Sequence, residues 1–227
     1  MQKLLLALSI AYFLSACASE ETNPPIVVET NEVLPSTVTK NPQGNKDLPL
    51  TDDEAITRIR AFFQKVSSQR TAGTLKSEEV EYACEGTGQV GVVTFYSDAG
   101  GVVLVENEYG MGDHAGQTDQ WYFIEGKLAF LYAQAGTWQF GGAMTKDQDG
   151  NEVPGTIDKI TENRYYFNDG VLVKHLTKYY EIESGKEEVD PNNVPNETVP
   201  HNGETPESYD FIAAFMATRT PDCGLIE

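Results

Sequence analysis

The middle of the chain is a series of β-like segments separated by tight turns, and this pattern constrains the fold more than any other feature. Three hairpins are predicted, joining Val90–Tyr96 to Val102–Glu106, Gln120–Ile124 to Leu128–Ala133, and Ile160–Phe167 to Leu172–Ile182. The segments are rich in Val, Tyr, Phe and Thr, which favour strands. Two of the turns contain Glu125-Gly126 and Asp169-Gly170. Glycine tolerates the positive φ that tight hairpin turns require, so an antiparallel meander is expected.

Aromatic residues precede two of these turns in a repeated arrangement. Trp121-Tyr122-Phe123 lies before Glu125-Gly126, Tyr165-Tyr166-Phe167 lies before Asp169-Gly170, and Phe95-Tyr96 gives a looser third copy. The simplest interpretation is that each aromatic strand contributes to one common core. The alternative is an aromatic binding face for glycans or peptidoglycan.

Two amphipathic helices flank the β region. Thr51 begins a capping-box pattern, and apolar residues follow at helical spacing, which predicts a helix over about Asp52–Gln69. A shorter helix is expected over Glu207–Thr218, with Phe211 and Phe215 on its buried face. The predicted fold class is therefore α+β. It is an antiparallel β-meander sheet of about six to eight strands, barrel-like or a sandwich, with an N-terminal amphipathic helix and a short C-terminal helix.

The first residues are typical of a processing signal. Lys3 precedes an apolar run from Leu4 to Phe13, which is about ten residues and well short of the roughly 20 that span a bilayer. The run ends in Leu14-Ser15-Ala16-Cys17, which resembles the lipobox of bacterial lipoproteins. The resemblance implies a signal peptide over 1–16 and an acylated Cys17 that anchors the protein to a membrane. A proline-rich tether is expected over 17–50, followed by a single domain over 51–227 with a polar loop at about 184–206.

The residues after Cys17 bear on location. In lipoproteins, Asp directly after the cysteine tends to cause retention in the inner membrane, whereas this chain has Ala18. The resemblance therefore favours the outer membrane of a bacterial cell envelope. Glu20-Glu21 weakly resembles the acidic export tags of surface lipoproteins. The periplasmic face and the cell surface both stay open.

Charge restricts the partners. The chain has 35 acidic and 16 basic residues, which gives a net charge of −19. Nucleic acid and anionic lipid surfaces both require a basic footprint, so neither is expected as a partner. The remaining expectations are the membrane, reached through the lipid anchor, and another envelope protein or a glycan.

Two cysteines remain after lipidation, Cys84 and Cys223. In an oxidising compartment outside the cytoplasm, an isolated pair favours a disulfide over a catalytic thiol. The bond would close a loop of about 140 residues, for which the chain-entropy model gives at most roughly 4–5 kcal/mol of stabilisation.

One glycine-rich loop is a candidate ligand site. Met111, Asp113 and His114 lie between Gly110 and Gly116, where Asp113 could orient the imidazole for acid–base chemistry. No catalytic sequence motif supports this chemistry, so a flexible loop between strands is the simpler interpretation. His175 is expected to be a half-exposed residue of the sheet.

The three histidines are too few and too dispersed to predict a conventional zinc site. The segment 147–152 is acidic, but it does not match a calcium loop, because Thr145 and Thr156 occupy the first and last positions, where Asp and Glu are required. No metal and no cofactor are expected.

A second resemblance concerns the first strands. Tyr82-Ala83-Cys84, followed by Val93-Thr94-Phe95-Tyr96, is similar to the opening strands of membrane-bound lysozyme inhibitors, which are small disulfide-bonded lipoproteins. The inhibitory loop of that family is not found, and this chain is longer.

The sequence thus predicts a membrane-anchored, non-catalytic envelope lipoprotein that acts as a binding or assembly module. An inhibitor or glycan-binding module is the alternative. A hydrolase is the third class, and it would require a pocket in which carboxylates, or Asp113 and His114, converge.

Overall fold

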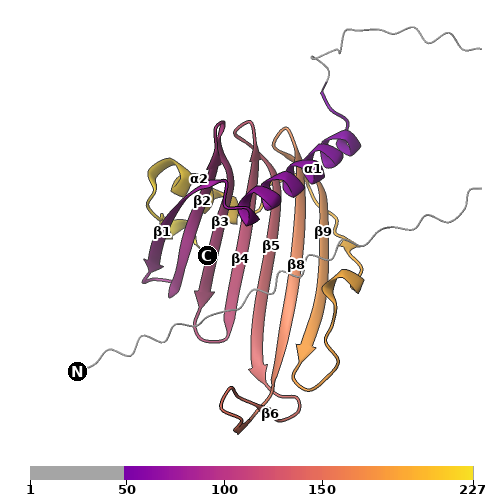
Figure 1. Cartoon of the computed structure of the whole chain (residues 1–227). Coiled ribbons are helices and arrows are strands. Elements are labelled where there is room, and N and C mark those ends of the chain that lie inside the picture. The colour runs from indigo at the N-terminus through magenta and orange to yellow at the C-terminus, as the bar shows by residue number, and fades with distance from the viewer. Residues whose placement is uncertain (1–48, 227) are drawn as a thin grey trace, which may run out of the picture. The chain divides into compact units, whose positions relative to one another are not determined.

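An eight-stranded antiparallel sheet dominates the computed structural model, which describes residues 49–226 (Figure 1). The predicted signal peptide, the lipidation site Cys17 and the tether up to residue 48 lie outside the described residues. The strand order is β1-β2-β3-β4-β5-β8-β9-β10, and neighbouring strands are antiparallel throughout. The strands of this sheet are β1 Lys76–Cys84, β2 Gln89–Asp98, β3 Gly101–Met111, β4 Ala115–Ile124, β5 Lys127–Phe140, β8 Thr156–Asn168, β9 Val171–Glu183 and β10 Glu197–Thr198.

The remaining elements are two α-helices, a small hairpin and two 3-10 turns. They are α1 Asp52–Thr71, α2 Ser208–Thr218, β6 Thr145–Lys146 paired with β7 Glu152–Val153, η1 Pro191–Asn193 and η2 Cys223–Leu225. The antiparallel meander with two helices agrees with the α+β class predicted from the sequence.

The three predicted hairpins are present as β2–β3, β4–β5 and β8–β9. Their turn residues explain why. Glu125 and Gly126 have φ angles of 53° and 78°, and Asp169 and Gly170 have φ angles of 50° and 82°. Positive φ at both central residues gives the twist that matches two antiparallel strands, and glycine at the second position adopts it without a steric penalty.

The sheet is open, with β1 and β10 at its edges, so neither a closed barrel nor a packed pair of sheets is formed by the described residues. The reason is that both faces of the central strands are apolar, and helices cover them. Trp121 and Tyr122 are neighbours in β4, and successive strand residues point to opposite faces. The expected single core is therefore wrong, because the aromatic strands supply two cores, one on each face.

Each core contains one helix. On one face, which we call the α1 face, α1 packs on strand residues; this core includes Ile59, Val66, Leu104, Tyr122, Phe130 and Tyr166. On the other face, which we call the α2 face, α2 packs on strand residues. This core includes Val105, Trp121, Leu131, Phe167, Phe211 and Phe215. Figure 1 shows α1 crossing the strands in front and α2 behind the β1 end of the sheet.

Helix α1 begins at the residue that the capping pattern indicates. The Thr51 hydroxyl accepts a hydrogen bond from the Glu54 amide at 3.4 Å, and the Glu54 carboxylate accepts from the Thr51 amide at 2.9 Å. These reciprocal bonds satisfy amides that have no partner within the helix.

The polar segment between β9 and α2 lies along the sheet edge and is not an excursion away from it. Within this segment β10 pairs with β9, placing Glu197 opposite Thr177 and Thr198 opposite Leu176. The backbone carbonyl of Pro191, in η1, accepts a hydrogen bond from the Lys178 ammonium group at 2.7 Å. We call residues 184–198 the strap, since they close over buried side chains of β8 and β9.

Cys84 and Cys223 lie at disulfide-bonding distance, as the sequence predicted, with their Cα atoms 5.5 Å apart. Cys84 is the last residue of β1, and Cys223 begins η2 after α2. The pair thus holds the C-terminal tail beside the β1–β2 hairpin.

Candidate functional site

The glycine-rich loop singled out in the sequence connects β3 to β4 and contacts a residue that the sequence did not indicate. Met111 is the last residue of β3, while Asp113 and His114 are exposed in the loop. The His114 ring stacks on the indole of Trp138, with ring centroids 3.9 Å apart and an angle of 15° between the planes. Trp138 comes from the neighbouring strand, β5. The loop is therefore packed against an aromatic ring.

Three hydrogen bonds fix this pair. The Trp138 amide donates to the His114 carbonyl at 3.0 Å, and the Trp138 indole Nε1 donates to the Asp113 carbonyl at 3.0 Å. His114 Nδ1 lies 3.2 Å from the Trp138 carbonyl. Because a carbonyl only accepts, Nδ1 carries the proton in this bond. The Trp138 backbone thus orients the imidazole, and the Asp113 carboxylate does not have that role.

A surface cavity of about 490 Å³ lies beside the pair. Its lining residues are Asp113, His114, Ala115, Thr137, Trp138, Gln139, Ile157 and Lys159. Phe140 extends the aromatic surface, since its ring meets that of Trp138 edge-on at 5.3 Å and its side chain is 65% exposed. We call Trp138, His114 and Phe140 the aromatic platform. The volume lies within the range of roughly 300–1,000 Å³ that small-ligand sites occupy.

A second cavity, of about 210 Å³, lies on the α2 face. Its lining residues are Gln89, Asn107, Tyr109, Asp119, Glu207, Ser208, Phe211, Leu225 and Ile226. Asn107, Asp119 and Gln89 are only 2–4% exposed, whereas Glu207 and Ser208 are exposed. Polar side chains of β2, β3 and β4 therefore form the deep wall of this cavity, and the start of α2 lies toward the solvent.

The deep wall contains a chain of hydrogen bonds. Gln89 Nε2 donates to the Tyr82 hydroxyl at 2.7 Å, and that hydroxyl donates to Asn107 Oδ1 at 3.0 Å. Asp119 accepts one bond, from Gln117 Nε2 at 2.8 Å, and no other donor reaches its carboxylate within residues 49–226. Burial raises the pKa of Asp119 to about 6, and the Gln117 bond only partly opposes this effect. Burial and the nearby Asp119 charge raise the pKa of Tyr109 as well.

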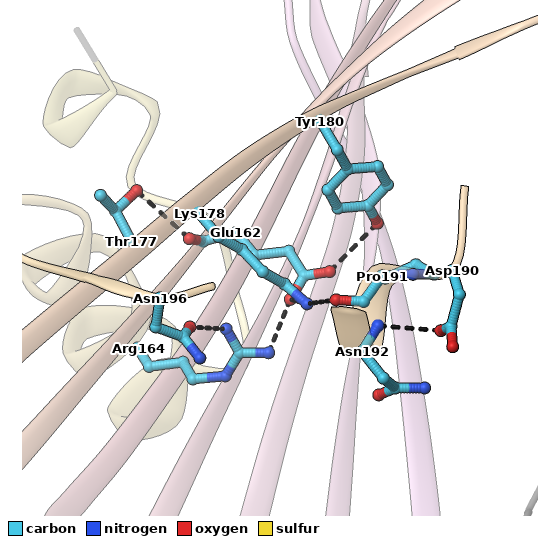
Figure 2. A network of polar contacts seen from close by, with 9 residues as sticks. All are labelled: Glu162, Arg164, Thr177, Lys178, Tyr180, Asp190, Pro191, Asn192 and Asn196. Atoms are coloured by element: carbon cyan, nitrogen blue, oxygen red, sulfur yellow. Dashed lines mark hydrogen bonds and ion pairs between the residues drawn. The ribbon is translucent and has the colours of Figure 1, made fainter. Parts of the chain in front are cut away.

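A third polar cluster, on the α1 face, is closed (Figure 2). The carboxylate of Glu162, 3% exposed, accepts from Arg164 at 2.6 Å and from the Tyr180 hydroxyl at 3.0 Å, and it pairs with Lys178 at 3.2 Å. The strap lies over the cluster through the Lys178–Pro191 bond. The Glu162 carboxylate thus has three partners within the protein, so this cluster is structural.

The remaining sequence candidates have local partners. The His175 ring stacks on Tyr165 with centroids 4.1 Å apart, and its Nε2 lies 3.0 Å from Asn163 Oδ1. Burial, with a contribution from the His201 charge, lowers the pKa of His175. The carboxylate of Asp147 accepts hydrogen bonds from the amides of Asp149 and Asn151, which makes this acidic segment the turn between β6 and β7.

Within residues 49–226, no group of three or more His, Cys, Asp or Glu side chains lies close enough to hold a metal ion. Neither of the two described helices is both long and apolar enough to cross a membrane. No protein-family model, curated protein or solved structure matches this chain.

Sequence reasoning missed Trp138, Lys159 and Asp119. Strand alternation gives a signal for Asp119, because it lies in phase with Trp121 and Phe123, whose side chains point into the α2-face core. No comparable signal joins Trp138 to the loop at His114, because that contact depends on the pairing of β4 with β5.

Proposed function

We propose that the chain is a lipid-anchored, non-catalytic binding module of a bacterial envelope that holds a glycan on the aromatic platform. The lipobox-like sequence ending in Cys17 supports the anchor, and the isolated cysteine pair supports an oxidising compartment. The net charge of −19 argues against polyanionic ligands, whose binding depends on Lys and Arg.

One observation carries the ligand assignment, namely that Trp138 is fixed before any ligand arrives. Its amide, carbonyl and indole Nε1 all contact the His114 loop, and the rings of His114 and Phe140 pack on it. A side chain held in one orientation loses little conformational entropy when it binds, so the surface is preorganised.

The chemistry around Trp138 fits a sugar. An aromatic face offers apolar area to the C–H surface of a pyranose ring, and polar side chains at the rim offer partners for its hydroxyls. Here the rim contains Asp113, Thr137, Gln139 and Lys159, which together supply both donors and acceptors.

Tryptophan fluorescence tests the assignment directly. The chain has two tryptophans, and Trp121 is fully buried, so a ligand on the platform changes the emission of Trp138 alone. We expect chitotetraose or a soluble peptidoglycan fragment to give a saturable change that Trp138→Ala abolishes. Tyr179→Ala is the matched control, because this residue is another exposed aromatic on a different strand. Equal glycan affinity in the Trp138→Ala variant, measured by calorimetry, would refute the platform as the site.

The same titration addresses the inhibitor alternative. The resemblance of the first strands to lysozyme inhibitors predicts that lysozyme, rather than free glycan, binds the domain. Saturable binding of lysozyme together with no response to either glycan would replace the glycan proposal with that alternative.

A protein partner is the second candidate, and one observation favours it. Phe140 is the last residue of β5 and is 65% exposed, and Met144, shortly before β6, is 59% exposed. Aromatic residues and Met are enriched in protein interfaces. A photo-crosslinking residue at position 140 should capture one envelope protein in stoichiometric amount if this candidate is correct, and the same residue at position 179 should not.

The anchor has its own test. Cys17→Ser removes the thiol that would be acylated, so the variant should move from the membrane fraction to the soluble fraction after alkaline extraction. If the variant stays in the membrane fraction, the anchor assignment is wrong, whatever the outcome at the platform.

A further inference from the structure

We infer that the cavity on the α2 face binds a small organic cation, an ammonium or guanidinium group, with Asp119 as its counter-charge. This site shares no lining residue with the aromatic platform, so the inference does not depend on the proposed glycan function.

The Asp119 carboxylate has no cationic partner within the described residues. A buried carboxylate is ordinarily paired with a cation or with several hydrogen-bond donors. Asp119 is 2% exposed, and its only hydrogen bond within the described residues comes from the neutral amide of Gln117. It also lines a cavity, so a cation that enters can supply the missing partner.

The deep wall also contains two amide side chains beside the Asp119 carboxylate. Gln89 and Asn107 are almost fully buried and also line the cavity. The Tyr82 hydroxyl is hydrogen-bonded to one polar atom of each amide, Gln89 Nε2 and Asn107 Oδ1. Gln89 Oε1 and Asn107 Nδ2 take no part in these two bonds. Gln89 Oε1 therefore provides a second acceptor for a donor-rich cation.

The remaining walls and the mouth of the cavity also suit a cation. Tyr109 and Phe211 place aromatic rings beside the cavity, and aromatic faces attract cations. Glu207, exposed at the mouth, adds a second negative charge. The first amides of α2 do not form an anion site there, because those of Tyr209 and Asp210 already donate to the carbonyls of Pro206 and Glu207.

The size of the cavity limits the ligand. Its 210 Å³ is several times the volume of about 30 Å³ that one water molecule occupies in the liquid. The cavity is nevertheless smaller than most sites for drug-sized ligands. An alkylammonium or guanidinium ion fits this size, whereas a polyamine or a peptide could place only one end group in it.

Calorimetry on the full chain in detergent at pH 7.5 tests the inference. Ethylammonium and guanidinium are the cationic probes, and acetate and ethanol at the same ionic strength are the anionic and neutral probes. At least one cation should bind saturably with one-to-one stoichiometry, and acetate and ethanol should not. Asp119→Asn should weaken the affinity for the cation by about tenfold or more, as expected for the loss of a charge-assisted hydrogen bond.

Two control variants test whether the loss of cation affinity is specific to Asp119. Glu187→Gln removes one exposed negative charge outside the cavity and should leave the affinity unchanged. Trp138→Ala should also leave it unchanged, which separates this site from the platform.

The inference fails if neither cation binds saturably, if acetate binds as well as the cations, or if Asp119→Asn binds them as tightly as the natural chain. The comparison of cations with acetate uses the natural chain, so it decides the matter even if the Asp119 variant does not fold.

Discussion

Glu162 on the α1 face and Asp119 on the α2 face are both buried carboxylates, and their partners are of opposite kinds. On the α1 face, Glu162 meets two cations and a tyrosine hydroxyl. On the α2 face, Asp119 meets one neutral amide from Gln117. Both residues are 2–3% exposed, so the difference lies in their partners and not in their burial.

The surroundings follow the same division. The strap closes over Glu162, and Lys178 reaches both the Glu162 carboxylate and the Pro191 carbonyl. Asp119 lines an open cavity, and Trp121 on the same strand keeps a buried indole Nε1 without a hydrogen-bond partner among the described residues. A buried charge whose partners are all present stabilises an arrangement of the chain. A buried charge without them costs stability, and such unusual carboxylates are concentrated at functional sites.

The largest expected effect on the free energy of unfolding comes from the cysteine pair, which lies on the α2 face only. Cys84→Ala combined with Cys223→Ala should lower the free energy of unfolding by up to about 4 kcal/mol, because the closed loop is long. Urea unfolding of the natural chain and the double variant measures the loss. Hydrogen exchange should accelerate first in β1 and α2, and uniform acceleration across both faces would contradict the division proposed here.

Next in size is the effect of removing a cation from the closed cluster. Lys178→Met leaves Glu162 buried with one ion pair fewer and frees the Pro191 carbonyl, so we expect a loss of about 3 kcal/mol. The matched control is Lys127→Met, whose partner Asp169 is 69% exposed. An exposed pair contributes less than about 1 kcal/mol. Equal losses in the two variants, measured by urea unfolding, would show that the cluster is not structural.

The sequence predicted the division into strands better than the division into faces. The hairpins were visible because Glu125-Gly126 and Asp169-Gly170 determine local backbone angles. The open sheet was not visible, because closure depends on whether β1 meets the last strand, and no local pattern encodes that contact. The second core follows from alternation alone, which Trp121 and Tyr122 already displayed.

The candidate sites were less predictable still. Asp119 and Glu162 are two of 35 acidic residues, and only their phase within a strand marks them as inward-facing. Whether an inward-facing carboxylate finds a cation depends on strands and a strap far away in the sequence. The loop at His114 was identified, but its partner Trp138 lies 24 residues away and is brought close by sheet pairing.

Asp119 is expected to have a smaller effect on the free energy of unfolding than Lys178, and this effect depends on pH. Its pKa is raised from 3.8 to about 6 by burial, so the folded protein binds this proton more tightly than the unfolded chain. The contribution of this group to stability therefore falls as pH rises from about 4 to about 6, and it stays low above that range.

Asp119→Asn removes the charge and should be more stable than the natural chain at pH 7.5 by an amount on the order of 2 kcal/mol. The difference should shrink toward zero near pH 4, where Asp119 is protonated. Paired urea titrations of the two proteins across this range measure it. A difference that is independent of pH would show that Asp119 has an ordinary pKa in the folded state.

The smallest expected effect compares two tyrosine hydroxyls, one on each face. Tyr180 donates to the charged Glu162, and burial together with that charge raises the pKa of Tyr180 to about 12, so the hydroxyl remains a donor at neutral pH. Tyr82 donates to the neutral amide of Asn107.

Hydrogen bonds to charged groups contribute about 1.5–3 kcal/mol, against about 1 kcal/mol for neutral pairs. Tyr180→Phe should therefore cost roughly 1 kcal/mol more than Tyr82→Phe when both are measured by urea unfolding at pH 7.5. If Tyr82→Phe proves the more costly, the α2-face hydrogen-bond chain contributes more to folding than its neutral partners imply. The cavity wall would then have to be regarded as part of the structural core.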